Sequence, residues 1–155
     1  MTPSLPEGTI IRPARRDDAD AVVALMREFT LYVSGEATGS LDTLLEEWDD
    51  PDIDLARDSR VVYAPDGRLV AYAILWSSGR IALPIVEVFL HTDEWARDDS
   101  TEPVLLAWAE ARSRENLADL PPETRLALQA FADSREARFA GVMAAHEYGA
   151  IRHSF

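Results

Sequence analysis

The segment 86–115 constrains the fold of this chain most, because it joins a strand pattern to a long helix pattern through a short acidic loop. Residues 86–90 (VEVFL) suit a buried strand, and residues 102–116 suit an amphipathic helix. A helix that begins after a strand and a short loop attracts anions, since its first N–H groups lack partners and its dipole favours negative charge. Where a phosphate-binding loop carries glycines, this one carries Asp98, Asp99, Ser100 and Glu102. The segment therefore has the outline of an anion site but holds negative side chains.

Two further helices are predicted upstream of this segment. Asp17 or Asp18 is a suitable cap for the first helix, whose apolar side chains recur at helical spacing: Val22, Leu25, Met26 and Phe29. Ser40 is a suitable cap for the second helix, over residues 41–50, whose apolar positions are Leu41, Leu44, Leu45 and Trp48. Each stripe is wide enough to pack on a sheet.

The remaining patterns predict strands and a closing helix. Strands are expected at residues 9–12, 59–64, 68–77, 81–90 and 125–132, and a last helix at 134–148. Pro65, Asp66 and Gly67 form a turn signal that makes a hairpin of the second and third strands. The strand–helix–strand order after residue 86 requires a parallel crossover. We therefore predict an α/β chain (α+β in some schemes): a mixed sheet with an antiparallel centre, a parallel βαβ crossover and helices on both faces.

Charge and composition exclude several classes of function. With 155 residues the chain fits one domain, and its net charge of −13 argues against nucleic acid and anionic membranes as partners. There are no cysteines, which excludes disulfides and thiolate metal sites and fits the cytoplasm. The three histidines show no metal-ligand spacing, so no metal site is expected.

Four stretches in this order resemble the GNAT superfamily of acetyl-CoA-dependent N-acetyltransferases. IRPARRDDADAVVALM is similar to the opening strand and helix of the family, and EEWDDPDIDLARDSRVVYAPDGRLVAYAILW to its second helix and central hairpin. VEVFLHTDEW followed by LLAWAEARSRE is similar to its cofactor-binding strand and helix, and MAAHEYGAIRHSF to its closing helix. The resemblance covers nearly the full chain. It implies one GNAT-like domain over residues 1–155, without the final strand of the family.

The resemblance implies acetyl-CoA as cofactor and assigns its binding positions. The family pattern Arg/Gln-x-x-Gly-x-Gly/Ala precedes a Leu-Leu pair, here Leu105-Leu106, and places Arg97 at the arginine. The glycine positions fall on Asp98, Ser100 and Glu102, while Phe89 and Leu90 occupy the cofactor-binding strand. Glycine lets a backbone approach a pyrophosphate without a Cβ in the way, so these replacements oppose binding. As an alternative, the acids stabilise the N-terminus of the helix, with Ser100 or Thr101 as its cap.

The catalytic positions of the family are partly absent. Glu87 lies where members carry a general base, and burial would raise its pKa. The position of the tyrosine that protonates the leaving thiolate holds Ala145, and the neighbouring His146 suits packing on the apolar side of its helix. Glu87 is therefore the catalytic candidate, against the alternative of an ordinary strand residue.

Two functions follow from the resemblance. The first is a degenerate GNAT domain, weak or inactive by itself, that pairs with a second GNAT domain or forms a homodimer. The chain resembles the N-terminal copy in tandem acetyltransferases of the mycothiol synthase type. The second is an active N-acetyltransferase that acts on a small cationic amine. A third interpretation is an acidic module that binds polyamines or other cations without turnover.

Overall fold

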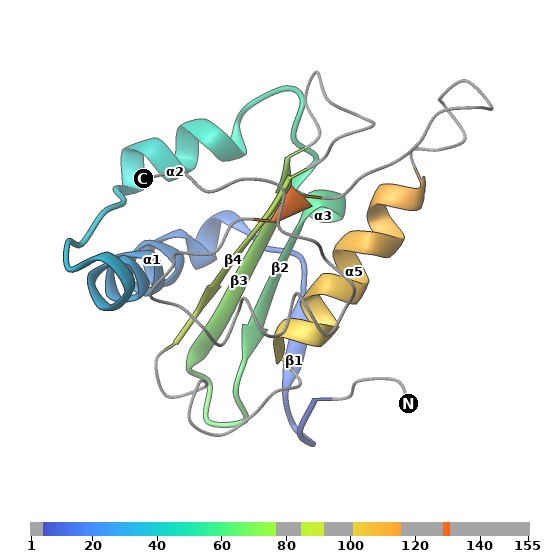
Figure 1. Ribbon diagram of the computed structural model, residues 1–155, viewed down its shortest axis with the longest axis horizontal. Helices are drawn as coiled ribbons and strands as arrows, with labels where there is room; N and C mark the ends of the chain where they lie inside the picture. Colours follow the sequence, from blue (N-terminus) through green and yellow to red (C-terminus); the bar gives the residue numbers. More distant parts are fainter. Residues whose placement is uncertain (1–4, 77–84, 92–100, 116–128, 131–155) are drawn as a thin grey trace.

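The computed structural model describes residues 5–76, 85–91, 101–115 and 129–130. Within these ranges the strands form one sheet in the order β1-β2-β3-β4-β5 (Figure 1). The strands are β1 (Ile10–Arg12), β2 (Ser59–Tyr63), β3 (Leu69–Trp76), β4 (Ile85–Leu90) and β5 (Gln129–Ala130). Neighbours from β1 to β4 pair antiparallel, whereas β4 and β5 pair parallel. The predicted antiparallel centre and parallel crossover are both confirmed.

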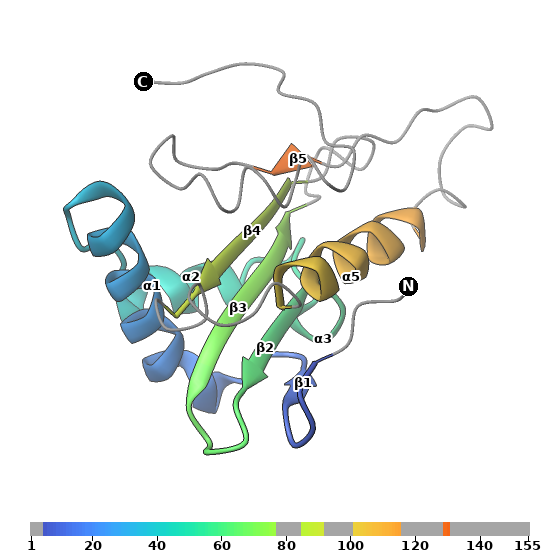
Figure 2. The same ribbon diagram turned by 60° about the horizontal axis from the view of Figure 1, so that its bottom comes forward.

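Helices cover both faces of this sheet, as the sequence predicts. The helices are α1 (Ala19–Ser34, preceded by a 3-10 turn at Arg16–Asp18), α2 (Leu41–Trp48), α3 (Leu55–Asp58) and α5 (Thr101–Glu115). Figure 2 shows α1 and α2 on one side of the sheet and α5 on the other. The predicted final helix at 134–148 lies outside the described residues.

The hairpin between β2 and β3 turns where the sequence predicts. Gly67 has φ +87°, a left-handed conformation that a residue with a Cβ rarely adopts, and its N–H donates to the Ala64 carbonyl at 2.9 Å. The Ala64 N–H in turn donates to Arg68 at 2.9 Å. The hairpin delivers β3 to the middle of the sheet, where seven of its eight residues are buried.

The two faces of β3 and β4 build two separate apolar layers. One face packs on α5 and holds Val86, Val88, Leu90, Leu105, Leu106 and Ala109. The other packs beneath α1 and α2 and holds Val22, Leu25, Leu44, Trp48, Tyr72, Ile74 and Phe89. Because strand side chains alternate between faces, consecutive residues of one strand serve both layers.

The helix caps agree only in part with the sequence. The Ser40 hydroxyl accepts a hydrogen bond from the Thr43 N–H at 3.2 Å, which confirms the predicted cap of α2. Asp18 does precede α1, but its carboxylate makes no capping bond to that helix and turns back to the Arg15 N–H at 2.8 Å. Leu41, predicted in the apolar stripe of α2, is 38% exposed, because the first three residues of that helix are all exposed to solvent.

Candidate functional site

Glu87 lies on the sheet face that α1 and α2 cover, not on the α5 face. The register pairs Glu87 with Ile74 on the neighbouring strand β3, and Ile74 is buried beneath α1 and α2. Its own side chain is exposed to solvent. Val86 and Val88 point to the opposite face, toward α5, whereas Phe89 shares the face of Glu87.

The pKa of the Glu87 carboxyl is nevertheless raised. The main cause is loss of hydration, which the nearby Trp76 indole partly offsets. Exposure and a raised pKa coexist where protein atoms crowd a carboxyl group without covering it. The Trp76 Nε1 is buried and makes no hydrogen bond of standard geometry with a described residue.

A second carboxylate, Glu47 of α2, belongs to the same face. Its pKa is also raised, first by its own burial and then by repulsion from Glu87. Neither Glu47 nor Glu87 forms an ion pair with any residue in the described ranges. Two mutually repelling carboxylates without a counter-ion favour a cationic ligand.

Aromatic side chains on this face join the helices α1 and α2 to the strands β3 and β4. The Trp48 Nε1 donates to the Tyr72 hydroxyl at 3.0 Å, which ties α2 to β3. The ring of Phe89 stacks on Tyr72 with centroids 5.9 Å apart and meets Phe29 of α1 edge-on at 5.3 Å. Burial raises the pKa of Tyr72; the Trp48 bond lowers it, and Glu47 and Glu87 raise it further.

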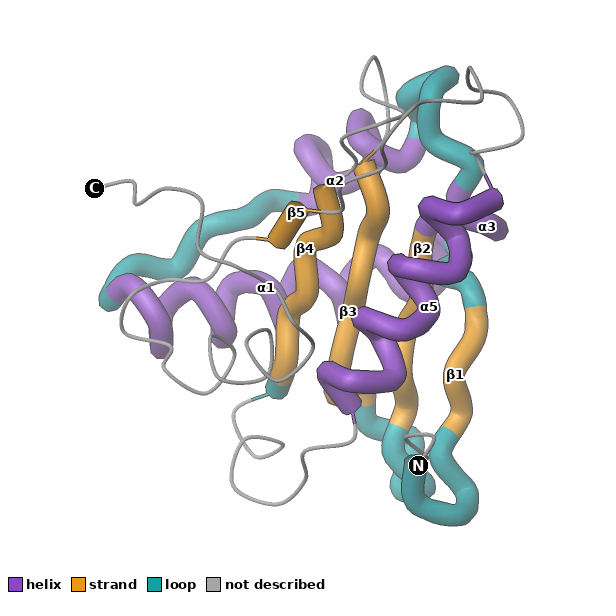
Figure 3. The backbone as a smooth tube through the Cα atoms, turned by 45° about the vertical axis from the view of Figure 1, so that its right-hand side comes forward, coloured by secondary structure: helices purple, strands orange, loops and turns teal. Residues whose placement is uncertain are grey.

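Phe89 and Leu90, the two residues of β4 predicted to bind the cofactor, direct their backbone groups to opposite edges of the strand. The His91 N–H donates to Val70 at 2.8 Å, so the alternation of an antiparallel ladder directs the N–H and C=O of Phe89 toward β3 as well. The corresponding groups of Val88 and Leu90 point to the other edge. There, the described part of β5 pairs only with Ile85 and Val86 (Figure 3). Leu90 thus directs its backbone groups away from β3, whereas Phe89 contributes its ring to the core.

The structure describes one of the four predicted loop residues. Arg97, Asp98 and Ser100 lie outside the described residues. Glu102 is in the first turn of α5 and is 1% exposed. Glu102 is thus an acidic residue of the first helical turn, as the alternative interpretation expects, but it is buried. Thr101 is already helical, which excludes it as the cap.

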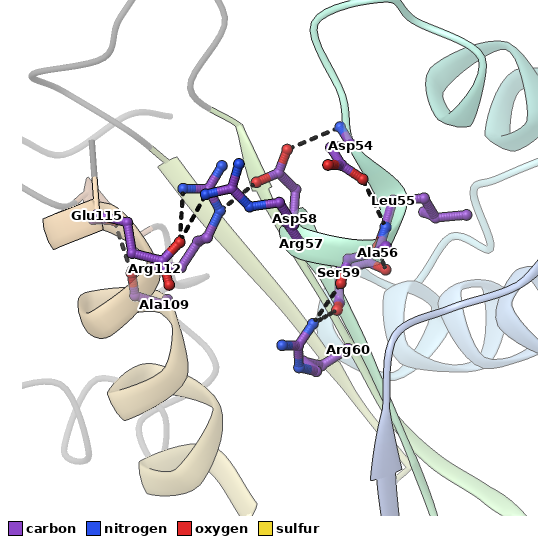
Figure 4. Close-up of polar contacts among 11 residues, drawn as sticks. Asp54, Leu55, Ala56, Arg57, Asp58, Ser59, Arg60, Ala109, Arg112 and Glu115 are labelled. Atoms are coloured by element: carbon purple, nitrogen blue, oxygen red, sulfur yellow. Dashed lines mark hydrogen bonds and ion pairs between the residues drawn. The ribbon is translucent and has the colours of Figure 1, made fainter. Parts of the chain in front are cut away.

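A polar network joins the C-terminal half of α5 to the α3 segment (Figure 4). The Arg112 Nε donates to Asp58 Oδ1 at 2.9 Å, and the other carboxylate oxygen of Asp58 accepts from the Asp54 N–H at 3.0 Å. Arg57 reaches the same helix through Glu115 at 2.9 Å. The network fixes the helix end remote from the loop.

Sequence reasoning did not single out Tyr72, Trp48 or Trp76 as site residues. Glu47 was visible only as part of an acidic stretch on α2. The signal that could have joined them is the period-2 spacing of Tyr72, Ile74 and Trp76 on one strand face. That spacing does not say which strand or helix lies opposite.

Within the described residues no group of three or more potential ligands could hold a metal ion. Among the helices of those residues, none combines the length and apolar character that crossing a bilayer requires.

No protein-family model and no curated protein matches the sequence. Solved structures do match. A GCN5-related N-acetyltransferase from Sphaerobacter thermophilus aligns with a TM-score of 0.83 and 24% identity over 92% of this chain. An acetyltransferase from Salmonella typhimurium, solved with its cofactor acetyl-CoA, aligns with a TM-score of 0.72 and 15% identity, over 92% of this chain and 80% of that one. An N-acetyltransferase from Staphylococcus aureus aligns with a TM-score of 0.67 and 14% identity, over 90% and 82%.

The chain has the GNAT fold. Its strand order, its parallel β4–β5 pair and the helix after β4 are the features that the GNAT resemblance predicts. The chain spans 44% of the length of the Sphaerobacter structure. The resemblance to the tandem mycothiol synthase type stays a prediction.

Proposed function

We propose that this chain is a GNAT domain with a degenerate acetyl-CoA site, which binds the cofactor weakly, has little or no transferase activity by itself and acts with a partner domain. The charge of the loop between β4 and α5 carries the proposal. Residues 91–102 hold five acidic residues and one arginine, a net charge of −4. In the GNAT resemblance this loop is the seat of the cofactor diphosphate.

The size of the repulsion supports weak binding. A carboxylate about 4 Å from a phosphate oxygen costs roughly 4 kcal/mol at an effective dielectric constant of 20. Even a quarter of that, about 1 kcal/mol, is about a fivefold loss of affinity.

The part of β4 that the GNAT resemblance assigns to the cofactor does not oppose binding through its charge. The backbone groups of Val88 and Leu90 point to the edge of β4 away from β3, and such groups suit the amide-bearing arm of acetyl-CoA. The residues therefore fit one end of the cofactor and oppose the other. A domain of this kind is expected to keep its shape and lose affinity.

Isothermal titration with acetyl-CoA tests the proposal. We expect no saturable binding below about 1 mM for the unaltered chain, which corresponds to a binding free energy weaker than about −4 kcal/mol. Asp98→Gly with Ser100→Gly restores two glycine positions and should tighten binding at least tenfold. Asp17→Asn is the control, since it removes one exposed charge from the turn before α1 and should change little. Micromolar binding by the unaltered chain would overturn the proposal.

A second candidate is an active N-acetyltransferase on a small cationic amine, and the raised pKa of Glu87 favours it. Acetyl-CoA would supply the acyl group, and a carboxylate with a raised pKa is a better base for an ammonium proton. Thiol release should then depend on added amine, and Glu87→Gln should lower kcat by about a hundredfold or more. Glu46→Gln, an exposed neighbour on α2, is the matched control. Amine-dependent release that survives Glu87→Gln would remove Glu87 as the base.

The partner is proposed to be a second GNAT domain or a second copy of this chain, in the cytoplasm. Light scattering during size-exclusion chromatography gives the mass in solution. A dimer mass supports the second copy. A monomer supports a separate GNAT domain as the partner, which co-purification of such a domain with the tagged chain would identify.

A further inference from the structure

The Arg60 side chain lies between the start of β2 and the middle of α5. The register pairs Arg60 with Ala73, which belongs to the apolar layer under α5, so Arg60 points to that face of the sheet as well. There the guanidinium carbon of Arg60 lies over the Trp108 ring, 5.1 Å from the ring centroid. A guanidinium group over an aromatic ring keeps its N–H groups, which point along its own plane, for hydrogen bonds.

Arg60 has no carboxylate partner of its own, because other arginines bind the acidic residues around it (Figure 4). Asp58 accepts from Arg112 at 2.9 Å, while Glu115 accepts from Arg57 at 2.9 Å and from Arg112 at 3.4 Å. No ion pair joins Arg60 to an acidic residue of the described ranges. Loss of hydration lowers the pKa of Arg60, and the Glu115 and Asp58 carboxylates raise it less. Arg60 is therefore a partly dehydrated cation without a counter-ion.

Hydrogen-bond donors of two side chains have no acceptor at this place. The Arg60 Nη1 donates to the Ala56 and Ser59 carbonyls at 3.2 and 2.6 Å, whereas its Nε and Nη2 donate to none of the described residues. The Trp108 Nε1, in the ring beneath the guanidinium group, is buried and also lacks an acceptor among those residues. Burying a donor without an acceptor is destabilising. An anion that accepts from both side chains would remove that penalty.

The chemistry of these donors favours a carboxylate over other anions. The planar fork of a guanidinium group matches the two oxygens of a carboxylate group. The net charge of −13 opposes every anion, but it opposes a monoanion less than an anion of higher charge such as phosphate.

We propose that Arg60 and Trp108 bind the carboxylate group of a small organic monoacid. One oxygen accepts from the Arg60 guanidinium group, and the other accepts from the Trp108 indole after a shift of the overlying Arg60 side chain. Trp108 is in the middle of α5, whereas the acidic loop precedes the first turn of that helix. The proposal therefore does not depend on acetyl-CoA binding, and either can fail while the other stands.

Side-chain NMR of the full chain, titrated with sodium acetate at pH 6.5, tests the proposal. The ionic strength is held at about 0.15 M, where surface charges are screened beyond about 8 Å. We expect the Arg60 Nε–H and Trp108 Nε1–H signals to shift together and to saturate with one dissociation constant, below about 50 mM. Sodium chloride in place of acetate should shift neither signal. Shifts that do not saturate, or a shift of the Arg60 signal alone, would overturn the proposal.

Inorganic phosphate is the competing anion. We expect phosphate to bind more weakly than acetate under the same conditions, because it carries more negative charge toward an acidic chain. Phosphate that binds as tightly as acetate, or more tightly, would show that the site responds to charge alone and would refute a carboxylate site.

Variants assign the two contacts. Arg60→Lys keeps the positive charge but loses the fork, and should weaken acetate binding about tenfold, followed by the Trp108 signal. Trp108→Phe keeps a ring under Arg60 but loses the N–H, and should weaken acetate binding about three- to tenfold, followed by the Arg60 signal. Arg114→Gln removes an exposed arginine from the same helix and is the matched control, which should bind acetate like the unaltered chain.

Unchanged acetate binding by Arg60→Lys would contradict the proposal, as would an equal loss in Arg114→Gln. Thermal melts of all three variants check that they fold. If Trp108→Phe does not fold, Arg60→Lys still decides, because Arg60 is only partly buried and the Trp108 signal remains to report binding.

Discussion

The Arg112 side chain donates through Nε to Asp58 Oδ1 at 2.9 Å, and this pair joins α5 to the residue before β2 (Figure 4). Both side chains are almost entirely buried, with 10% and 3% of their surfaces exposed. A charge in such a place requires its partner, since removing one member leaves the other unpaired away from water. The pair therefore fixes where the C-terminal end of α5 lies against the sheet.

Arg112→Met should destabilise the chain by about 3–5 kcal/mol, because it leaves the Asp58 carboxylate buried without its cation while keeping the length of the side chain. Urea unfolding followed by tryptophan fluorescence measures the change. Arg57→Met is the control: Arg57 binds Glu115 with both side chains more than half exposed, so its loss should change stability little. Equal effects of the two substitutions would contradict the buried pair as the anchor.

Asp18 should make stability depend on pH in acid. Burial alone would raise its pKa, but hydrogen bonds from Arg12, Tyr63 and the Arg15 N–H outweigh it and lower the pKa to about 2. Because the folded pKa lies below the ordinary value of 3.8, the stabilisation is present above that value and is lost as pH falls toward 2. The shift corresponds to roughly 2 kcal/mol.

Asp18→Asn should therefore lower the free energy of unfolding at pH 7 and flatten its dependence on pH between about 4 and 2. Denaturant titrations at several pH values measure both quantities. Asp17→Asn changes an exposed neighbour and serves as the control. A variant as pH-dependent as the unaltered chain would place the acid sensitivity elsewhere.

Phe89→Ala should cost about 3–5 kcal/mol, since Phe89 is 8% exposed and its ring contacts both Tyr72 and Phe29. Phe89→Leu keeps most of the buried area and should cost much less, chiefly the aromatic contacts of about 0.5–1.5 kcal/mol each. Thermal melts compare the two. A Phe89→Leu chain with unchanged stability and altered acetyl-CoA binding would return the side chain to the cofactor site.

Ser40→Ala should destabilise the chain by about 1 kcal/mol, because the Thr43 N–H loses its capping oxygen. Ser40→Gly should cost only a few tenths of a kcal/mol, as glycine is tolerated at a helix N-cap. Ser40 is exposed, so neither change removes buried contacts. Similar losses from both substitutions would indicate that the hydroxyl does not cap α2.

Local patterns predicted the elements of this fold because each depends on neighbours in the chain. Ser40 predicts the start of α2, and Gly67 predicts the β2–β3 turn. The strand–helix–strand order of the sequence predicts the parallel pairing of β4 and β5. The caps that failed depend on contacts far along the chain. Asp18 turns away from α1 because Tyr63, 45 residues later, donates to it at 2.5 Å.

The sequence by itself determined the fold class, the order of strands and helices and the acidic character of the loop between β4 and α5, since these follow from periodicity, turn residues and charge. Only the tertiary structure decided that Glu87 lies on the face of β4 that α1 and α2 cover. The same holds for the packing of the Phe89 ring in the core and for the burial of Glu102. Strand residues alternate between two faces, and which element covers each face depends on packing between segments distant in the chain. The chemistry of Glu87 is set by that packing.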